Sequence, residues 1–335
     1  MRLIVLPGSG QAPARALSLA WSPRGPCALI AAMGPRGPFA TVALVGRQAS
    51  PGIIEPLQRL AAFLAARGHS VLLDAETAQF APLPGSKTAS TAELGRDAKL
   101  GIVVGGDGTM LSAARRLAPF GVPLIGINQG RLGFLTDIAL SDMEPTLSAM
   151  LDGAYVEETR TLLEAVLMRA TGDGERALAL NDVVVNRGAL GGMIDCGVSI
   201  DGRFVYALRA DGIIIATPTG STAYALSAQG PIVDPAVASM LLVPVAPHAF
   251  TYRPVVLRDS VVIEISLLGG KDASLHCDGQ SDFPLAEGDK VVVRRAEHRV
   301  RLLHPKDHDH FAMLRQKLHW SETPERMKPG ADSVS

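Results

Sequence analysis

The stretch Val103-Val104-Gly105-Gly106-Asp107-Gly108-Thr109 decides the fold of the first half of the chain. It continues an apolar run from Leu100 and precedes a helical pattern at residues 110–118, which predicts a strand, a glycine-rich turn and a helix. Glycine lets the backbone approach a phosphate, and a helix N-terminus offers free N–H groups to an anion. Open α/β sheets bind ligands at the carboxyl ends of their strands. Asp107 is therefore a candidate functional residue.

Strands and helices alternate on both sides of this turn. Short apolar runs predict strands, and apolar residues at helical spacing predict helices. The expected strands are 41–45, 71–73, 100–104 and 122–127, and the expected helices are 52–67, 91–97, 110–118 and 142–150. The stretch 81–90 is expected to be a loop. Such alternation is typical of a parallel sheet covered by helices, so we expect an open parallel-sheet α/β domain over residues 38–154.

The period changes to that of β-structure after residue 155. The expected strands are 163–169, 179–186, 194–200, 203–209, 212–216, 255–257, 261–265 and 290–295. Turn signals separate several of them, and we expect a β-rich sandwich domain over 155–300. Residues 301–320, with a helix at 311–318, are expected to return to the first domain. Residues 1–37 and 321–335 are expected to be disordered, and either Met1 or Met33 is the start.

The composition fits a two-domain globular protein. The chain has 335 residues, 47% of them apolar, and a formal net charge of −1. This charge argues against a broad nucleic-acid surface, and no uncharged apolar run approaches the ~20 residues that span a bilayer. The cysteines Cys27, Cys196 and Cys277 form no C-x-x-C pair, which favours a reducing compartment. We therefore expect a cytoplasmic protein without nucleic-acid or membrane partners.

A second loop, rich in hydroxyl groups, follows the expected strand 212–216. The segment Thr217-Pro218-Thr219-Gly220-Ser221-Thr222 contains four hydroxyl residues and leads into an expected helix at 223–228. Such a loop offers hydroxyl and N–H groups to phosphate or ribose oxygens. A helix cap would need only one serine or threonine. We therefore expect this loop to contact a ligand.

The glycine-rich turn matches neither of the common nucleotide-binding patterns. Walker A requires G-x-x-x-x-G-K-[ST], and the dinucleotide fingerprint requires G-x-G-x-x-G. The string Gly105-Gly106-Asp107-Gly108-Thr109 instead resembles the kinase superfamily of NAD kinases, diacylglycerol and sphingosine kinases, and 6-phosphofructokinases. Alone it does not choose among them.

Further motifs resemble those of the NAD kinase family of bacterial type. They are N-Q-G-R-L-G-F-L-T at 128–136, Asn181-Asp182, D-G followed by T-P-T-G-S-T-A-Y within 211–224, L-V-P-V-A-P-H at 242–248, and C-D-G-Q at 277–280. Their order and spacing agree with that family over about residues 40–320. The resemblance implies ATP-dependent phosphorylation of the adenosine-ribose 2′-hydroxyl of NAD, giving NADP and ADP. It also implies Mg²⁺, or another divalent cation, carried with ATP.

The resemblance also implies residue roles. Asp107 would be catalytic, either as the base that takes the hydroxyl proton or as an organiser of that hydroxyl and the metal, and both roles stay open. The phosphate loop would comprise Gly105, Gly106, Gly108 and Thr109. The implied NAD-binding residues are Asp107, Gly108, Asn181, Asp182, Arg209, Asp211, Thr222, Ala223, Tyr224, Ser227, His248 and Gln280.

Several of these positions carry finer expectations. Asp182 stands where the family usually has glutamate, so its contacts need a small backbone shift or a bridging water. Asp211 would reach the nicotinamide end, from a neighbouring subunit, and His248 suits a structural role equally well. Family members with glycine at the position of Arg209 accept polyphosphate or NADH more readily, so arginine implies selectivity for ATP and NAD. The family forms homo-oligomers, and we expect a dimer or tetramer.

Two other functions remain open. A lipid kinase of the diacylglycerol type would share Asp107, but the sequence shows no basic amphipathic helix, and its 217–222 loop argues against this reading. A non-catalytic dinucleotide-binding regulator could share the fold, although Asp107 among glycines favours an enzyme. The histidine-rich tail at 304–310 suggests a metal. His308 and His310 would diverge on a helix, so no metal is assigned there.

Overall fold

The computed structural model describes residues 38–47, 52–130, 133–172, 174–188 and 192–320, and contains two sheets. The expected disordered segments 1–37 and 321–335 lie outside the described residues, as does Met33. The first part of the chain holds β1(Thr41–Gly46), α1(Ile54–Ala66), β2(Ser70–Asp74), α2(Ala75–Ala78), β3(Lys87–Ala89), α3(Thr91–Asp97), β4(Leu100–Gly105), α4(Asp107–Leu117), β5(Leu124–Asn128), β6(Ile138–Ala139) and α5(Met143–Leu151).

The strands of this first part form a parallel sheet, which confirms the expected α/β architecture. Strands β5, β4, β1, β2 and β3 follow one another in the sheet, and each adjacent pair is parallel. Strand β4 is buried along its whole length because helices cover both faces of the sheet. Leu57 of α1 and Leu147 of α5 pack on one face, and Met110 and Leu117 of α4 pack on the other.

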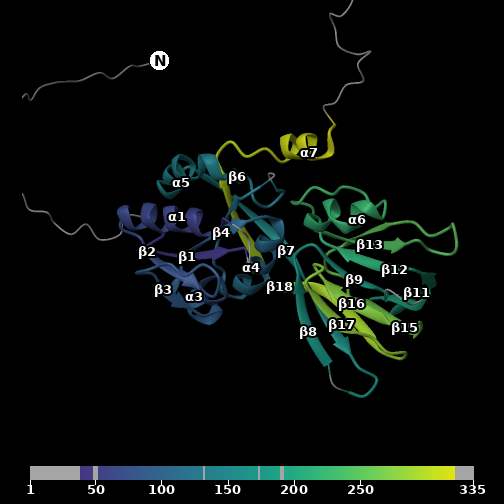
Figure 1. Cartoon of the computed structure of the whole chain (residues 1–335). Helices are drawn as coiled ribbons and strands as arrows, with labels where there is room; N and C mark the ends of the chain where they lie inside the picture. The colour runs from purple at the N-terminus through teal and green to yellow at the C-terminus, as the bar shows by residue number, and fades with distance from the viewer. Residues whose placement is uncertain (1–37, 48–51, 131–132, 173, 189–191, 321–335) are drawn as a thin grey trace, which may run out of the picture. The chain divides into compact units, whose positions relative to one another are not determined.

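The second part of the described chain is built mainly of antiparallel strands. Its elements are β7(Tyr155–Met168), β8(Gly174–Ala179), β9(Asp182–Arg187), β10(Ile194–Ile200), β11(Arg203–Ala210), β12(Gly212–Ala216), α6(Tyr224–Ser227), β13(Ser239–Val245), β14(Val255–Arg258), β15(Ile263–Gly269), β16(Ala273–Cys277), β17(Ser281–Pro284), β18(Lys290–Pro305) and α7(His310–Leu318). Figure 1 shows α1, α3, α4 and α5 beside the parallel strands, whereas α6 is the helix labelled among the antiparallel strands.

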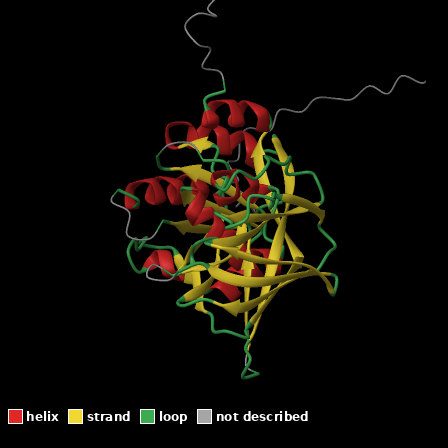
Figure 2. Cartoon of the chain, turned by 90° about the vertical axis from the view of Figure 1, so that its right-hand side faces the viewer, coloured by secondary structure: helices red, strands yellow, loops and turns green. Residues whose placement is uncertain are grey.

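The antiparallel strands form a sandwich, as expected. A six-stranded sheet runs in the order β14-β13-β12-β9-β16-β17. Side chains alternate across it: Val183 and Val185 of β9 enter the core shared with the larger sheet, whereas Val184 packs with Ala225 of α6 on the outer face. Ile265 of β15 lies in the shared core too. In Figure 2 most helices lie at the top and left of the view, and few helices cover the strands at the right.

The two parts share a strand, which explains how distant segments meet. The 16-residue strand β18 pairs with β7 and β15 in the antiparallel region and reaches β5 of the parallel region through Leu302 and Leu124. The larger sheet therefore has 12 strands and runs through both parts. Helix α7 follows β18, and its Lys317 ammonium lies 5.9 Å from the centre of the Phe134 ring, which fits the expected return to the first part of the chain.

Some elements differ from those predicted from the sequence. The expected loop 81–90 contains strand β3. This strand forms three parallel residue pairs with β2. The expected strand 179–186 is two strands, because the chain turns at Leu180 and Asn181 and passes from one sheet to the other. Strands β13, β16 and β17 were not predicted. Strands β16 and β17 are short and contain polar residues, so sheet pairing supplies what the local pattern lacks, whereas β13 has a continuous apolar run that Pro244 follows.

Candidate active site

Asp107 is the first residue of α4 and is held by a turn from another part of the chain. Its Oδ1 accepts hydrogen bonds from the Leu135 N–H at 3.0 Å and the Thr136 hydroxyl at 3.1 Å. Its Oδ2 accepts one from the Phe134 N–H at 2.7 Å. Asn128 at the end of β5 donates to Thr136 at 2.8 Å and steadies the turn. The carboxylate therefore has a fixed direction.

Gly133 makes this grip possible. A Cβ at Gly133 would lie 2.0 Å from Asp107 Oδ1 and 2.4 Å from the Thr136 hydroxyl oxygen. Only glycine leaves room for the carboxylate at this position. The motif at 128–136 thus has a physical role, because it positions Asp107.

The glycines of the phosphate loop are used for close approach and not for unusual backbone angles. Gly105, Gly106 and Gly108 are absent from the described glycines with positive φ. A Cβ at Gly105 would lie 2.5 Å from the Thr109 hydroxyl oxygen, whereas one at Gly106 would meet nothing within 4 Å. Gly106 therefore exposes its backbone to open space, as a phosphate loop requires.

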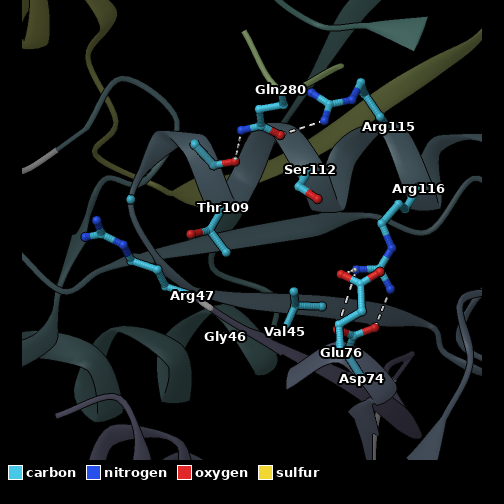
Figure 3. Close-up of a pocket in the computed structure, with 12 residues that line it drawn as sticks. Val45, Gly46, Arg47, Asp74, Glu76, Thr109, Ser112, Arg115, Arg116 and Gln280 are labelled. Carbon is cyan, nitrogen blue, oxygen red and sulfur yellow. Dashed lines mark hydrogen bonds and ion pairs between the residues drawn. The ribbon is translucent and has the colours of Figure 1, made fainter. Parts of the chain in front are cut away.

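A cavity of about 690 Å³ opens beside this loop. Figure 3 shows Arg47, Arg115 and Arg116 around it, with Thr109 and Ser112 on the α4 side. The full lining is Val45, Gly46, Arg47, Asp74, Glu76, Gly106, Gly108, Thr109, Ser112, Arg115, Arg116 and Gln280. Three guanidinium groups outnumber the carboxylates of Asp74 and Glu76 in this lining, and Gly106 and Gly108 lie at the N-terminus of α4, so the cavity favours a negatively charged ligand.

Two of these arginines are held by buried acids. Arg116 pairs with Asp74, whose side chain is 1% exposed, and its Nη2 donates to the Thr91 hydroxyl at 2.7 Å. Arg115 pairs with Asp278 at 2.5 Å and donates to Gln280 Oε1 at 2.6 Å. Their guanidinium groups are therefore placed before any ligand arrives, as Figure 3 shows for Arg116 with Asp74 and Arg115 with Gln280.

The turn between β16 and β17 joins this cavity to a second one. Asp278 in that turn is fully buried and accepts the backbone N–H groups of Leu180, Asn181 and Asp182 at 3.0, 2.8 and 3.2 Å. Gln280 lines the first cavity and donates to the Gly108 carbonyl at 2.8 Å. The turn 277–280 is therefore a wall shared by both cavities.

The second cavity has a volume of about 410 Å³ and contains four predicted residues. These are Asn181, Asp182, Ala223 and Tyr224; the remaining lining residues are Val184, Asn186, His276, Asp278 and Gly279. Burial, and then the charge of Asp278, raises the pKa of Asp182 to about 7, while a hydrogen bond from the Tyr224 backbone opposes the rise. Asp182 is thus a carboxyl group poised between its two charge states near neutral pH.

The hydroxyl-rich loop is arranged differently from the expectation. Thr217 donates to the Leu180 carbonyl at 2.6 Å and Ser221 to the Pro218 carbonyl at 2.6 Å, and both side chains are buried. The Thr222 hydroxyl donates to the Thr219 carbonyl at 3.1 Å. A Cβ at Gly220 would lie 2.0 Å from the Asn181 carbonyl oxygen. The loop therefore supports the backbone of Asn181, and the expectation that its hydroxyls face a ligand is wrong for Thr217 and Ser221.

Besides Asp107, five of the predicted NAD-binding residues line neither cavity: Arg209, Asp211, Thr222, Ser227 and His248. Arg209 and His248 line a third cavity of about 300 Å³, where the His248 N–H donates to the Arg209 carbonyl. Asp211 forms an ion pair with Arg187 at 2.9 Å. Ser227 is exposed at the end of α6. Within the described residues of one chain, these side chains are not brought to Asp107.

Sequence reasoning missed several residues that build the site. Arg47, Asp74, Ser112, Arg115, Arg116 and Asp278 were not predicted. Arg115 and Arg116 lie in the last turn of α4, where basic residues are commonly explained by the helix dipole. Asp278 belonged to a quoted motif and could have been found there, because a buried acid next to glycine in a turn needs several donors.

A strand, a glycine-rich turn and a helix form an anion site beside a second, nucleoside-sized cavity, and a fixed carboxylate lies at the turn. This arrangement defines a phosphotransferase that uses a nucleotide. Family models agree: the ATP-NAD kinase N-terminal domain matches residues 42–155, and the ATP-NAD kinase C-terminal domain matches residues 180–304. The chain belongs to the ATP-NAD kinase family.

Curated relatives and solved structures support this assignment. The chain is 53% identical over 282 residues to an NAD kinase of Aromatoleum aromaticum, covering 84% of this chain and 94% of the relative. It is 52% identical to an NAD kinase of Burkholderia thailandensis, covering 83% and 93%.

The fold resembles two solved structures. One is yeast NADH kinase complexed with NADH, with a TM-score of 0.78, 25% identity and coverage of 88% of this chain and 91% of that chain. The other is an NAD kinase from Archaeoglobus fulgidus in complex with ATP, with a TM-score of 0.65, 26% identity and coverage of 83% and 98%.

Proposed function

We propose that this chain transfers the γ-phosphoryl group of ATP to the adenosine-ribose 2′-hydroxyl of NAD, giving NADP and ADP. One observation carries the proposal: two cavities share the turn 277–280 as a wall, and the Gly105–Thr109 loop with Asp107 adjoins it. Phosphoryl transfer depends mainly on positioning and charge stabilisation. Two ligand sites beside one fixed carboxylate provide that positioning.

The larger cavity suits the triphosphate of ATP. Gly106 and Gly108 present backbone at the N-terminus of the 11-residue helix α4, and Arg47, Arg115 and Arg116 supply positive charge. Charge-assisted hydrogen bonds from arginine to phosphate are short and directional. Because Asp278 and Asp74 already hold two of these arginines, little side-chain ordering remains to be done on binding.

The smaller cavity suits the adenosine half of NAD. Tyr224 offers a ring beside a base, and Asn181 offers an amide that both donates and accepts. Asp182 in its charged form accepts hydrogen bonds from ribose hydroxyls. Its shorter side chain reaches the cavity from the first position of β9, whose backbone is fixed by Asp278.

Asp107 is proposed to hold, and to take the proton from, the reacting hydroxyl. An ionised carboxylate has about four lone-pair sites. Oδ1 already accepts two hydrogen bonds and Oδ2 accepts one, so Oδ2 retains a free site for the substrate hydroxyl. This count favours Oδ2 as the reactive atom.

Magnesium is proposed to arrive with ATP. Mg²⁺ prefers oxygen ligands and is commonly bound by one or two carboxylates together with substrate phosphates. Oxygen donors are present, because the Glu76 carboxylate and the Thr109 hydroxyl line the cavity proposed for the phosphates. When bound, the ion neutralises charge on the phosphate oxygens, while the residues of this chain orient the hydroxyl.

We also propose that the chain forms a homo-oligomer through its antiparallel region. Phe204 and Val205 of β11 and Val256 of β14 are exposed, as is Phe250, whose exposed fraction is 91%. Exposed apolar groups of this kind mark interaction sites. A partner subunit would also give a role to Arg209, Asp211 and His248, which lie apart from the cavities. Cytoplasmic location stays a prediction; the described cysteines, Cys196 and Cys277, are free and buried.

No described helix has both the length and the apolar character needed to cross a bilayer. The relatives and solved structures described above are all NAD or NADH kinases.

A coupled assay tests the proposed reaction. Purified protein is incubated with NAD, ATP and Mg²⁺, and an NADP-specific glucose-6-phosphate dehydrogenase converts product to NADPH, which is read by absorbance. The proposal predicts a signal that requires all three components. A flat trace from folded protein that binds NAD would support the regulator, and a flat trace without NAD binding would direct the search to lipid substrates.

A further inference from the structure

Asp137, His304 and His308 meet outside the two cavities. We call this group the Asp137 cluster. Asp137 lies just before β6, His304 lies near the end of β18, and His308 lies in the turn before α7. From the sequence, no metal was assigned because His308 and His310 would diverge on a helix. The structure instead pairs His308 with His304 and adds an acid that is 167 positions away from His304.

The ligand atoms of the Asp137 cluster converge on a small space. His304 Nδ1 and His308 Nδ1 lie 2.8 and 2.9 Å from the same atom, Asp137 Oδ2. One ligand atom from each of the three side chains lies within 4.8 Å of the others. The two imidazole rings are stacked, with centres 4.0 Å apart and planes at 21°. Both Nδ1 atoms therefore lie on the side of the stack that faces Asp137 Oδ2.

Burying several polar groups together raises the free energy of the fold unless each polar atom has a partner. The side chains of His304 and Asp137 are 2% and 7% exposed. Asp137 Oδ1 and His308 Nε2 are buried without a hydrogen-bond partner in the described part of the chain. Buried polar atoms are rarely left unpaired. In Asp137, Oδ2 contacts both imidazoles and Oδ1 has no partner among the described residues, so this carboxylate can still coordinate an ion.

A second carboxylate completes the arrangement. Glu158 Oε2 lies 3.3 Å from His304 Nε2, and Arg160 holds the same Glu158 oxygen at 2.6 Å. A metal-binding histidine usually has its other ring nitrogen held by a carboxylate or carbonyl, which fixes the ring and raises its basicity. Glu158 lies close enough to His304 Nε2 to do this, although the present geometry of the two atoms is not that of a hydrogen bond.

We propose that the Asp137 cluster binds one divalent transition-metal ion of the zinc class, through Asp137 Oδ2, His304 Nδ1 and His308 Nδ1. Zinc takes nitrogen and carboxylate ligands at ~2.0–2.2 Å, which at a tetrahedral centre places ligand atoms ~3.4 Å apart. A small opening of the cluster reaches that spacing. Binding displaces the two Nδ1 protons. Magnesium is a poor competitor because it prefers oxygen ligands.

The position gives the ion a structural consequence. Asp137 directly follows Thr136, whose hydroxyl holds Asp107. An ion on the Asp137 cluster ties the end of β18 and the turn before α7 to the turn that grips Asp107. It is separate from the divalent cation carried by ATP, and its binding does not rest on the proposed reaction.

The test uses tag-free, full-length protein treated with EDTA and then freed of chelator, in the absence of nucleotide. Co²⁺ is titrated and followed by visible absorption, Zn²⁺ is titrated by calorimetry, and both are repeated with millimolar Mg²⁺. The variants are His308→Phe, which keeps a stacked ring, Asp137→Asn, and Glu158→Gln. His298→Ala is the matched control, because His298 is an exposed histidine of the same strand β18 that does not belong to the cluster.

The proposal predicts one Co²⁺ per chain, displaced by Zn²⁺ and unaffected by Mg²⁺. His308→Phe and Asp137→Asn should weaken Zn²⁺ binding by about 100-fold or more, and Glu158→Gln by about 10- to 100-fold. His298→Ala should bind as the parent protein does. Circular dichroism of each variant verifies the fold. The proposal is overturned by a parent protein that shows no stoichiometric binding, or by binding that persists in His308→Phe and in Asp137→Asn.

Discussion

At the scale of single residues, the site depends on carboxylates whose surroundings differ. Asp107 is held by three donors and is proposed to contact the reacting hydroxyl, and Asp278 is buried under three N–H groups and an arginine. Asp182 lies between these extremes, since burial beside Asp278 raises its pKa to about 7. Similar side chains therefore have separate tasks.

The pKa of Asp182 makes stability depend on pH. Its folded pKa of about 7 lies above the ordinary value of 3.8. Between these values the folded chain keeps a proton that the unfolded chain loses, so stability falls as pH rises through this window. Asp182→Asn removes this cost, and we predict that it raises the melting temperature more at pH 8 than at pH 4. Thermal unfolding of both proteins at both pH values measures it; an equal shift would contradict the assignment.

Gly133 tests the grip on Asp107. Gly133→Ala places a Cβ where Asp107 Oδ1 now lies, so the carboxylate must move. We predict a fall in kcat of about 10-fold or more, with little change in the KM for NAD, because a small misplacement of a reacting group is costly. Gly130→Ala is the matched control, since its Cβ would meet only Asn128 Oδ1 at 3.9 Å. Comparable kcat values for the two variants would argue against the grip.

At the scale of elements, the β16–β17 turn organises the site. It fixes the start of β9 through Asp278 and contacts the first turn of α4 through Gln280. A helix from the parallel sheet and a strand from the sandwich are therefore held by one four-residue turn. This contact explains why both cavities share a wall.

Asp278→Asn should loosen this organisation. Both carboxylate oxygens of Asp278 accept hydrogen bonds from backbone N–H groups, and an amide NH₂ group cannot accept them. The substitution also removes the negative charge that pairs with Arg115. Breaking a buried ion pair costs about 3–5 kcal/mol. We predict a loss of unfolding free energy of that size in urea. Asp282→Asn in the same hairpin, where the side chain is 64% exposed, should change it little. A similar loss of unfolding free energy in both variants would show that Asp278 does not organise the turn more than an exposed residue of the same hairpin does.

At the scale of the whole molecule, β18 connects the two parts described here. Its 16 residues pair with β15 and β7 in the antiparallel region and with β5 in the parallel region. Leu302, at the pairing with β5, is 1% exposed. Stability of the two parts is therefore expected to be coupled.

Leu302→Ala tests that coupling. Removing a buried leucine costs about 2–5 kcal/mol. We predict that hydrogen exchange accelerates in β4 and β5 of the parallel region as well as in β7 and β18. Val293→Ala, a buried residue of β18 in the antiparallel core, serves as the comparison. Acceleration confined to one region in Leu302→Ala would show that the two parts unfold independently.

The sequence predicted much of this fold and part of the site. The helix at 54–66 and the strand at 100–105 were predicted well. The helical spacing of apolar residues in the first and the continuous apolar run in the second indicate directly which side chains are buried. Strand β16 was missed because it is only five residues long, although its alternating apolar and polar side chains are a strand pattern; its pairing with β9 is not visible in the local sequence. The glycine-rich turn revealed Asp107, whereas the roles of Arg115 and Asp278 depend on a contact across 163 positions that no local pattern shows.

The most direct test of the account is the kinetics of Asp107→Asn, measured together with NAD binding by calorimetry. An asparagine side chain has nearly the same size and can keep the two hydrogen bonds to Oδ1, but it cannot take the hydroxyl proton, and its NH₂ group loses the hydrogen bond that Oδ2 accepts from the Phe134 N–H. General-base catalysis contributes about 10²- to 10⁴-fold, so we predict a fall in kcat of that size with an NAD dissociation constant within a few-fold of the parent protein. Near-normal kcat in a variant that binds NAD normally would remove Asp107 from the reaction and contradict the account.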